Sequence, residues 1–318
     1  MKEIQIRKND AGQRLDRFVG KAVPLLPESL LQKYIRLKRI KRNGKGAKRD
    51  VRLVEGDVLQ LYINDEFFER PTEENAWLKI ATPRLDIVYE DENILLADKK
   101  PGVLCHSAGE WSWDTLISNI QAYLRQSGEW DPKAENAFTP ALCNRIDRNT
   151  GGIVIAAKNA EALRVLNEKI RERELSKFYL CICLGRPEPP KGRIECFLRK
   201  DSKTNTVRVY HHPVPDGRSA VTLYETLETR DRLSLVEVEL LTGRTHQIRA
   251  SFADMGHPLL GDGKYGVGSV NRRYGEAQQA LYSYRLRFDF PTDAGILNYL
   301  RGREFIADEV PFRRKYFG

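Results

Sequence analysis

The stretch NRIDRNTGG, residues 144–152, runs directly into the apolar segment IVIAA, residues 153–157. It places Asp147 between Arg145 and Arg148, ahead of a Gly-Gly turn and a strand that the apolar segment predicts. The two guanidinium groups favour the charged carboxylate, which suits a nucleophile or an electrostatic stabiliser better than a general acid. On this stretch alone, a structural turn with surface ion pairs is the more common explanation.

A shorter copy of the same pattern occurs near the N-terminus, at Arg14-Leu-Asp-Arg17. It leads into a helical run at Phe18 and Val19, and it lacks the Thr-Gly-Gly turn and the strand. We therefore expect Asp16 to be an acid on a helix surface. The meaning of Asp147 thus depends on the residues around it.

A second polar group stands at the start of a predicted helix, in the stretch TGRTHQIRASFADMGHP, residues 242–258. Thr245 is expected to cap this helix and Gly256 to end it. The side chains expected to be exposed at its start are Arg244, Thr245, His246 and Arg249. Such a helix start can bind phosphate or a buried carboxylate, and a solvated basic helix explains the pattern equally well.

The stretch LSKFYLCICLG, residues 175–185, alternates as a strand does, and it places Tyr179 on the face opposite the larger aliphatic side chains. Taken alone, a strand tyrosine is usually a packing residue. Other expected elements are strands over 86–90, 93–98 and 235–241 and a helix capped by Asn159.

The N-terminal part of the chain is a basic module. Two apolar helical faces, within residues 15–22 and 30–35, accompany ten Lys or Arg residues between positions 33 and 52, where Asp50 is the single acid. The side chains that we expect to contact a polyanionic partner are Lys33, Arg36, Lys38, Arg39, Lys41, Arg42 and Lys45. The domain boundaries that we expect are 12–64 for this module, 65–84 for a linker, 85–305 for a larger domain and 306–318 for a C-terminal tail.

Overall composition narrows the class of partner. A chain of 318 residues with a net charge of +9 points to a polyanion, with nucleic acid ahead of an anionic membrane. The five cysteines show no metal-binding spacing, and no Asp/Glu/His cluster supports a metal-dependent nuclease, so we expect reduced thiols and no metal. The N-terminus has no signal sequence, and the longest apolar segment is too short to cross a bilayer. We expect a soluble, cytoplasmic monomer without a membrane partner.

Together these stretches resemble the RluA family of pseudouridine synthases, whose signature is roughly His-Arg-Leu-Asp-Arg-x-Thr-Ser-Gly followed by an apolar strand. The resemblance covers about residues 85–305. Other segments of this chain are similar to further motifs of the family. In chain order they are Asn93–His106, Ser176–Tyr179, Gly243–Arg249, Gly256–Pro258 and Gly261–Asp262. The N-terminal module is similar, more loosely, to the RNA-binding domain of the fourth small-subunit ribosomal protein.

The resemblance implies an α+β fold with a mixed, mainly antiparallel central sheet, preceded by a small αβ RNA-binding domain. It implies isomerisation of uridine to pseudouridine in structured RNA, with no cofactor. Large-subunit (23S) ribosomal RNA is the favoured target. The alternatives are a tRNA pseudouridine synthase and a non-catalytic RNA-binding factor for ribosome assembly.

The resemblance also implies roles for four residues. Asp147 is the nucleophile or the carboxylate that deprotonates the sugar, and Arg249 pairs with it and keeps it ionised. Tyr179 stacks on the flipped base and can serve in proton transfer, while Arg145 fills the gap left in the RNA stack.

Four positions depart from the family pattern. Asn144 stands where the family usually has His, and Gly151 stands where it usually has Ser. Leu281-Tyr-Ser283 replaces a common Leu-His-Ala. These changes lie beside the acid, so they bear on which RNA is bound more than on the reaction.

Overall fold

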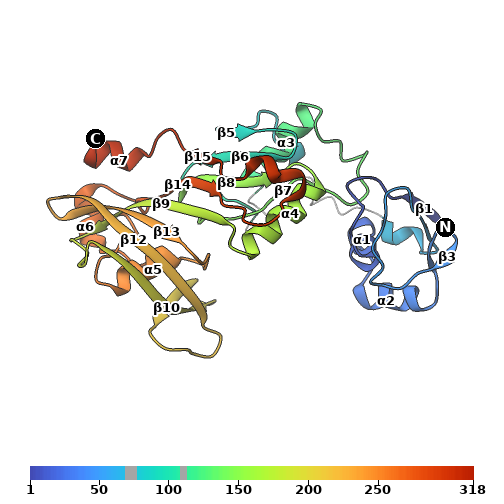
Figure 1. Ribbon diagram of the computed structural model, residues 1–318, viewed down its shortest axis with the longest axis horizontal. Coiled ribbons are helices and arrows are strands. Elements are labelled where there is room, and N and C mark those ends of the chain that lie inside the picture. The colour runs from blue at the N-terminus through green and yellow to red at the C-terminus, as the bar shows by residue number, and fades with distance from the viewer. Residues whose placement is uncertain (69–76, 108–112) are drawn as a thin grey trace.

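The computed structural model describes residues 1–68, 77–107 and 113–318. A small N-terminal module lies at one end of an elongated molecule, and a larger domain occupies the rest (Figure 1). No helix in these described segments is long and apolar enough to cross a membrane. All five cysteines are free, as expected.

The N-terminal module combines a small antiparallel sheet with two helices. The strands in spatial order are β1 (Lys2–Gln5), β4 (Val58–Leu61), β2 (Ile40–Arg42) and β3 (Lys45–Gly46). The helices are α1 (Leu15–Ala22), α2 (Glu28–Arg36) and the short 3-10 helix η1 (Asp65–Phe68). Both α-helices turn an apolar face to the sheet, and Leu15, Phe18 and Leu61 are fully buried between them. The helices expected from the apolar pattern are therefore present.

The larger domain is built on one long sheet. Its main path is β11 (Thr206–Tyr210), β10 (Lys191–Asp201), β12 (Arg218–Arg230), β13 (Leu233–Leu240), β9 (Leu175–Leu184), β14 (Leu281–Phe288), β8 (Gly151–Ala157), β6 (Ile94–Lys99) and β5 (Ile87–Glu90). Two short strands join it, β7 (Ala141–Leu142) on β8 and β15 (Glu304–Ile306) on β14. Only β14 and β8 pair in parallel among the described strands. The expectation of a mixed, mainly antiparallel sheet is confirmed.

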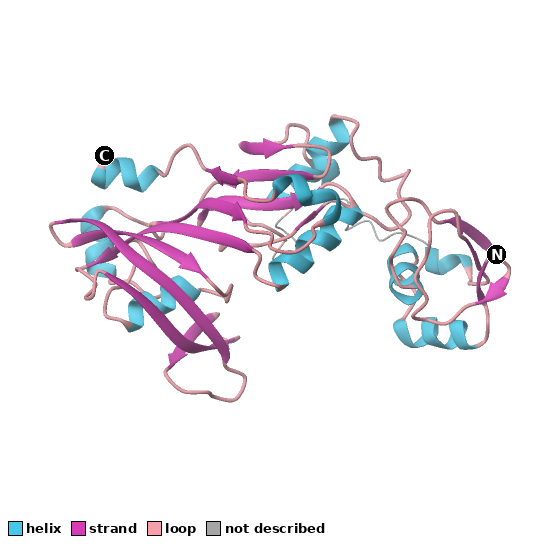
Figure 2. Cartoon of the chain, viewed as in Figure 1, coloured by secondary structure: helices cyan, strands magenta, loops and turns pink. Residues whose placement is uncertain are grey.

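Helices cover the sheet and flank the strands in Figure 2. They are α3 (Leu116–Gln126), α4 (Ala160–Arg171), α5 (Gln247–Asp254), α6 (Gly268–Tyr274), the 3-10 helix η3 (Gly295–Leu300) and α7 (Pro311–Phe317). Asn159 caps α4 as expected, because its side chain accepts a hydrogen bond from the amide of Ala162 at 2.8 Å.

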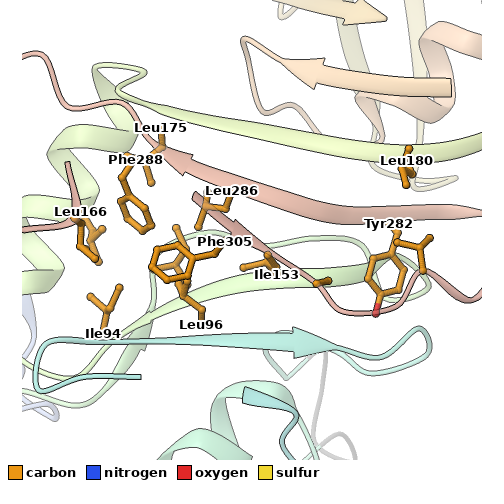
Figure 3. Packing of buried hydrophobic residues seen from close by; sticks show 14 of the residues in the cluster. Ile94, Leu96, Ile153, Leu166, Leu175, Leu180, Tyr282, Leu286, Phe288 and Phe305 are labelled. Atoms are coloured by element: carbon orange, nitrogen blue, oxygen red, sulfur yellow. The ribbon is translucent and has the colours of Figure 1, made fainter. Parts of the chain in front are cut away.

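Strand β8 is apolar throughout because both of its faces are covered. Ile153 and Ile155 face the cluster beneath α4, while Val154 and Ala156 face the cluster around α3. Figure 3 shows Ile153 beside Leu96 of β6, in the first of these clusters. A strand buried on two sides fixes the loop that precedes it, and that loop carries Asp147.

Hydrogen bonds join the N-terminal module to the larger domain. The side chain of Asn9 donates to Glu135 at 2.7 Å, and that of Asn136 donates to the carboxylate of Asp10 at 2.7 Å. Arg164 of α4 donates to the carbonyl of Ala11 at 2.9 Å. Because these bonds come from both sides of the contact, the module is held in a defined place against α4.

One detail of the expected helix was wrong. Helix α5 begins at Gln247 and is preceded by His246 in the left-handed region, with φ 52° and ψ 22°, so Thr245 does not cap it. Instead the side-chain oxygen of Gln247 accepts hydrogen bonds from the amide of Arg244 at 3.0 Å and from the hydroxyl of Thr242 at 2.9 Å. The helix therefore starts later and is turned differently than the sequence pattern predicted.

Candidate active site

Asp147 lies in the loop between β7 and β8, and its neighbours on both sides are fixed. Its own carbonyl accepts the amide of Thr150 at 3.1 Å, which closes a turn. The side chain of Asn144 accepts the amide of Ile155 at 2.8 Å, so the residue that departs from the family histidine ties the loop to β8. The carboxylate of Asp147 keeps 27% of its side-chain surface exposed.

A buried lysine supports this loop from below. Lys99 at the end of β6 is 1% exposed, and its ammonium donates to the carbonyls of Lys100, Val103 and Arg148 at 2.9–3.1 Å. Burial lowers the pKa of Lys99 to about 8. Sequence reasoning gave Lys99 no role, although a lysine inside an apolar strand was a signal for one.

The carboxylate of Asp147 is bound by Arg249 of α5. The Nη1 of Arg249 donates to Oδ2 of Asp147 at 2.8 Å, while its Nε and Nη2 donate to the two oxygens of Asp262 at 2.7 and 2.9 Å. Burial opposes the charge on Arg249, but these hydrogen bonds outweigh it and raise the pKa of Arg249 above its usual value. The guanidinium thus stays charged and holds one fixed orientation.

Two expectations about these side chains need correction. Arg249 was expected to be exposed at the helix start, but it is only 5% exposed because its guanidinium lies between the carboxylates of Asp147 and Asp262. Arg148 was expected to act on the aspartate beside it, but its Nε donates to the carbonyl of Gly102 at 3.1 Å. Among the described residues, the cationic partner that contacts Asp147 is Arg249.

A histidine and a tyrosine complete this side of the site. The Nε2 of His246 lies 3.8 Å from Oδ2 of Asp147, and its Nδ1 lies 2.8 Å from the hydroxyl of Tyr265. The same hydroxyl accepts the amide of Val207 in β11 at 2.7 Å. Sequence reasoning missed Asp262 and Tyr265 as site residues, because their contacts with the helix depend on the path of a loop.

Tyr179 lies in β9 on the site's side of the sheet, as the alternation predicted. It belongs to the apolar cluster beneath α5 and is 7% exposed, and its side chain is hydrogen-bonded to Ser283. Burial, together with the nearby charge of Asp147, raises the pKa of Tyr179 to about 12. Its hydroxyl therefore remains protonated at neutral pH.

Arg145 makes no contact with this network among the described residues. It is exposed, and no ion pair or hydrogen bond from its side chain occurs in the described segments. Its charge still reaches His106: burial and then Arg145 lower the pKa of that histidine. The structure therefore brings together Asp147, Arg249 and Tyr179, and it leaves Arg145 at the mouth of the site.

Two departures from the family pattern are in direct contact. A Cβ on Gly151 would lie 2.3 Å from the ring of Tyr282, which is far inside van der Waals distance. Tyr282 is 1% exposed, and its hydroxyl donates to Asp98 at 2.6 Å. The large ring of Tyr282 thus requires glycine at position 151, so the two departures from the family pattern depend on each other.

The basic residues of the N-terminal module differ in whether another side chain of the protein already binds their charge. Lys33 and Arg36 lie on α2. The cation of Arg39 lies 4.6 Å from the ring centroid of Tyr34, and that of Lys41 lies 5.2 Å from the ring centroid of Tyr62. Arg42 is bound to Asp57, with 2.6 Å between Nε and Oδ2. Lys38 follows α2, and Lys45 lines a shallow hollow of about 400 Å³ with Lys48. The surface is cationic, and Arg42 is the one of these seven residues whose charge is paired with a described acidic side chain.

Within the described residues, no three His, Cys, Asp or Glu side chains are grouped so as to hold a metal ion.

Comparisons with known proteins identify the family to which this chain belongs. Residues 93–254 match the family model described as RNA pseudouridylate synthase. An uncharacterized RNA pseudouridine synthase of Mycoplasma genitalium is 31% identical over 89% of this chain and 88% of its own length. The chain therefore belongs to the RluA-type RNA pseudouridylate synthase family, and it is a pseudouridine synthase, an isomerase.

Other relatives carry more specific names. Ribosomal large subunit pseudouridine synthase D of Neisseria meningitidis is 30% identical, covering 88% of this chain and 73% of its own. Ribosomal large subunit pseudouridine synthase C of Vibrio parahaemolyticus is 28% identical, covering 91% and 89%. The solved structure of human RNA pseudouridylate synthase domain containing 4 shares the fold, with a TM-score of 0.57 at 20% identity over 75% of this chain and 94% of its own.

Proposed function

We propose that this enzyme isomerises uridine to pseudouridine in large-subunit (23S) ribosomal RNA, with Asp147 as the reacting carboxylate. The observation that carries the chemical part is the ion pair between Asp147 and the buried Arg249. It places a fixed positive charge against a carboxylate at the edge of an apolar cluster, where the side chain of Asp147 is still partly exposed. An ionised and accessible oxygen is what either form of the reaction requires.

The reaction breaks the bond between C1′ of the ribose and N1 of uracil and forms a bond between C1′ and C5. The proton leaves C5 and a proton is added at N1, so no atom is gained or lost. Asp147 either attacks the sugar or removes a sugar proton. In both cases a negative carboxylate is needed at the start, and the fixed charge of Arg249 helps to preserve it.

Tyr179 and Arg145 have complementary roles in this proposal. Tyr179 forms the apolar floor against which the flipped uracil lies, and its protonated hydroxyl can donate a hydrogen bond. Arg145 is exposed and unpaired in the described structure, so it is free to enter the space that the uridine leaves. A target uridine must leave its stack, at a cost of about a few kcal/mol that is least in loops and bulges.

The N-terminal module offsets part of that cost by binding RNA phosphates. It is similar to the RNA-binding domain of the fourth small-subunit ribosomal protein, and its free cations are Lys33, Arg36, Lys38 and Lys45. Arg39 and Lys41 stack on tyrosines and still present charge. Phosphate contacts supply affinity and register rather than base readout.

Ribosomal RNA is favoured as the target because relatives named for the large ribosomal subunit align over most of this chain, including the N-terminal module. A tRNA target remains the alternative. Mapping pseudouridines across cellular RNA with and without the enzyme distinguishes the two, because a large-subunit enzyme changes only ribosomal RNA positions.

The catalytic role is tested with Asp147→Asn. We expect this variant to keep its fold and RNA affinity and to form no pseudouridine, because an amide cannot supply the negative oxygen. The matched control is Asp16→Asn, which alters the other Arg-x-Asp-Arg sequence, where Asp16 is bound by Arg14. Near-normal turnover by Asp147→Asn in a mass-spectrometric assay would refute the assignment.

A further inference from the structure

The two oxygens of Asp147 have unequal surroundings. Oδ2 receives the hydrogen bond from Arg249 at 2.8 Å and faces Nε2 of His246 at 3.8 Å. No side chain in the described segments is bonded to Oδ1. One oxygen is therefore held by the protein, and the other is open to a substrate.

His246 has one tautomer that fits its neighbours. The hydroxyl of Tyr265 accepts the amide proton of Val207, and its own proton is available to donate to Nδ1 of His246. A neutral imidazole with Nδ1 as acceptor carries its proton on Nε2. That proton faces the carboxylate of Asp147, whereas the other tautomer would point a lone pair at a negative oxygen.

The ring is also held in place. The side chain of His246 is 8% exposed, and its ring meets Tyr265 edge to face with 5.6 Å between centroids. Its backbone is in the left-handed region, which is costly for a residue other than glycine and is retained where the surroundings demand it. The charged groups around the ring are Asp147, Arg249, Lys264 and Asp262. Burial, more than any of these, lowers the pKa of His246 to about 4, so the ring is neutral at physiological pH.

We propose that His246 is a positioning residue: held by Tyr265 as the Nε2–H tautomer, it fixes Oδ2 of Asp147 together with Arg249 and leaves Oδ1 as the oxygen that reacts with the target nucleotide. This inference rests on the proposed role of Asp147. The distance of 3.8 Å is too long for a hydrogen bond, and it shortens when bound RNA excludes water and closes the site.

Three variants separate this role from simple packing. His246→Asn removes the donor near Asp147 and uses a residue that tolerates the left-handed backbone. His246→Gln places an amide nitrogen near the position of Nε2. We expect the single-turnover rate of His246→Asn to fall about tenfold to a hundredfold with RNA affinity unchanged, and His246→Gln to recover most of it.

Tyr265→Phe removes only the hydroxyl that fixes the tautomer. Nδ1 can then carry the ring proton, which would turn the lone pair of Nε2 toward Asp147, while burial still keeps the ring neutral. We expect the single-turnover rate of this variant to fall about tenfold with RNA affinity unchanged. The control is Tyr299→Phe, which loses a hydroxyl bonded to Asp91 in an exposed region of η3.

The tautomer of His246 is measured independently of enzyme activity, by nitrogen-15 NMR of the histidines in the full-length enzyme. The signal of His246 is the one that disappears in His246→Asn. A proton on Nδ1 in the unmodified enzyme, a normal rate for His246→Asn, equal losses in the Asn and Gln variants, or a normal rate for Tyr265→Phe would each overturn the inference. Activity in Asp147→Asn would instead refute the proposed function, and the NMR result would still stand.

Discussion

The carboxylate of Asp262 is fully buried and receives four hydrogen bonds. Two come from Arg249, and two come from the amides of Lys264 and Tyr265 at 2.8 and 3.1 Å. Burial alone would raise the pKa of Asp262, but Arg249 and these amides outweigh it and lower the pKa below its usual value. Asp262 thus holds Arg249 in the orientation in which its guanidinium contacts Asp147.

We expect Asp262→Asn to lower the free energy of unfolding by about 3 kcal/mol, because it leaves Arg249 buried with half of its compensating charge. Urea unfolding measures this loss. The matched control is Glu309→Gln, whose partner Arg314 is 83% exposed and whose own side chain is 70% exposed. That change should cost less than about 0.5 kcal/mol, and equal losses in the two variants would contradict the argument.

At this scale the sequence located Asp147, Arg249 and Tyr179, because ordered motifs carried them. It did not locate His246 and Asp262 in their roles. The contact of Asp262 with α5 depends on the course of the loop after the helix, and the orientation of His246 depends on a left-handed backbone. Neither the course of the loop nor the left-handed backbone produces a periodic pattern in the sequence.

Among the elements, the junction of β8 and β14 is the most tightly packed part of the site. The two strands run in parallel, with Gly151 opposite Tyr282 and Gly152 opposite Ser283. Gly152 has a φ of 113°, and a Cβ there would lie 2.2 Å from the carbonyl oxygen of Ser283. Only glycine permits this approach, which sets the start of β8 and therefore the position of the loop before it.

We expect Gly151→Ser to lower the free energy of unfolding by about 1–3 kcal/mol, because its Cβ overlaps the ring of Tyr282. Combining it with Tyr282→His, which restores the pair common in the family, should recover at least half of that loss. A thermal and urea double-mutant cycle measures the coupling. Strictly additive effects would show that the two positions do not interact.

The sequence predicted five of the eleven strands of this sheet, β5, β6, β8, β9 and β13, where the apolar periodicity is clear. Residues 153–157, expected as a strand, lie within β8, and Asn159 caps α4. The start of α5 was misplaced because the side chain of Gln247 binds back to the amide of Arg244 and His246 takes a left-handed conformation before the helix. Local competition between hydrogen-bonding side chains decides such ends.

For the whole molecule, the distribution of charge leads to a test of RNA binding. The cations to neutralise are Lys33, Arg36, Lys38 and Lys45, which have no acidic partner in the described structure. We expect their replacement by Gln to weaken RNA binding and to reduce the slope of log affinity against log salt by about three. Fluorescence anisotropy over a range of salt concentrations measures the slope.

Arg42→Gln provides the contrast. Because Arg42 is bound to the nearly buried Asp57, its loss should destabilise the N-terminal module more than it changes the salt slope. An unchanged slope in the fourfold variant would show that RNA binds elsewhere. A large change in slope for Arg42→Gln alone would show that its ion pair opens on binding.

The hydrogen bonds of Asn9, Asn136 and Arg164 have a further consequence for target choice. They hold the cationic surface of the N-terminal module at a set separation from Asp147. With the RNA-binding role proposed for this module, we expect the enzyme to select a uridine by its distance from the RNA segment that the module binds. Pseudouridine maps should then show modified positions that share this spacing and differ in the bases around them.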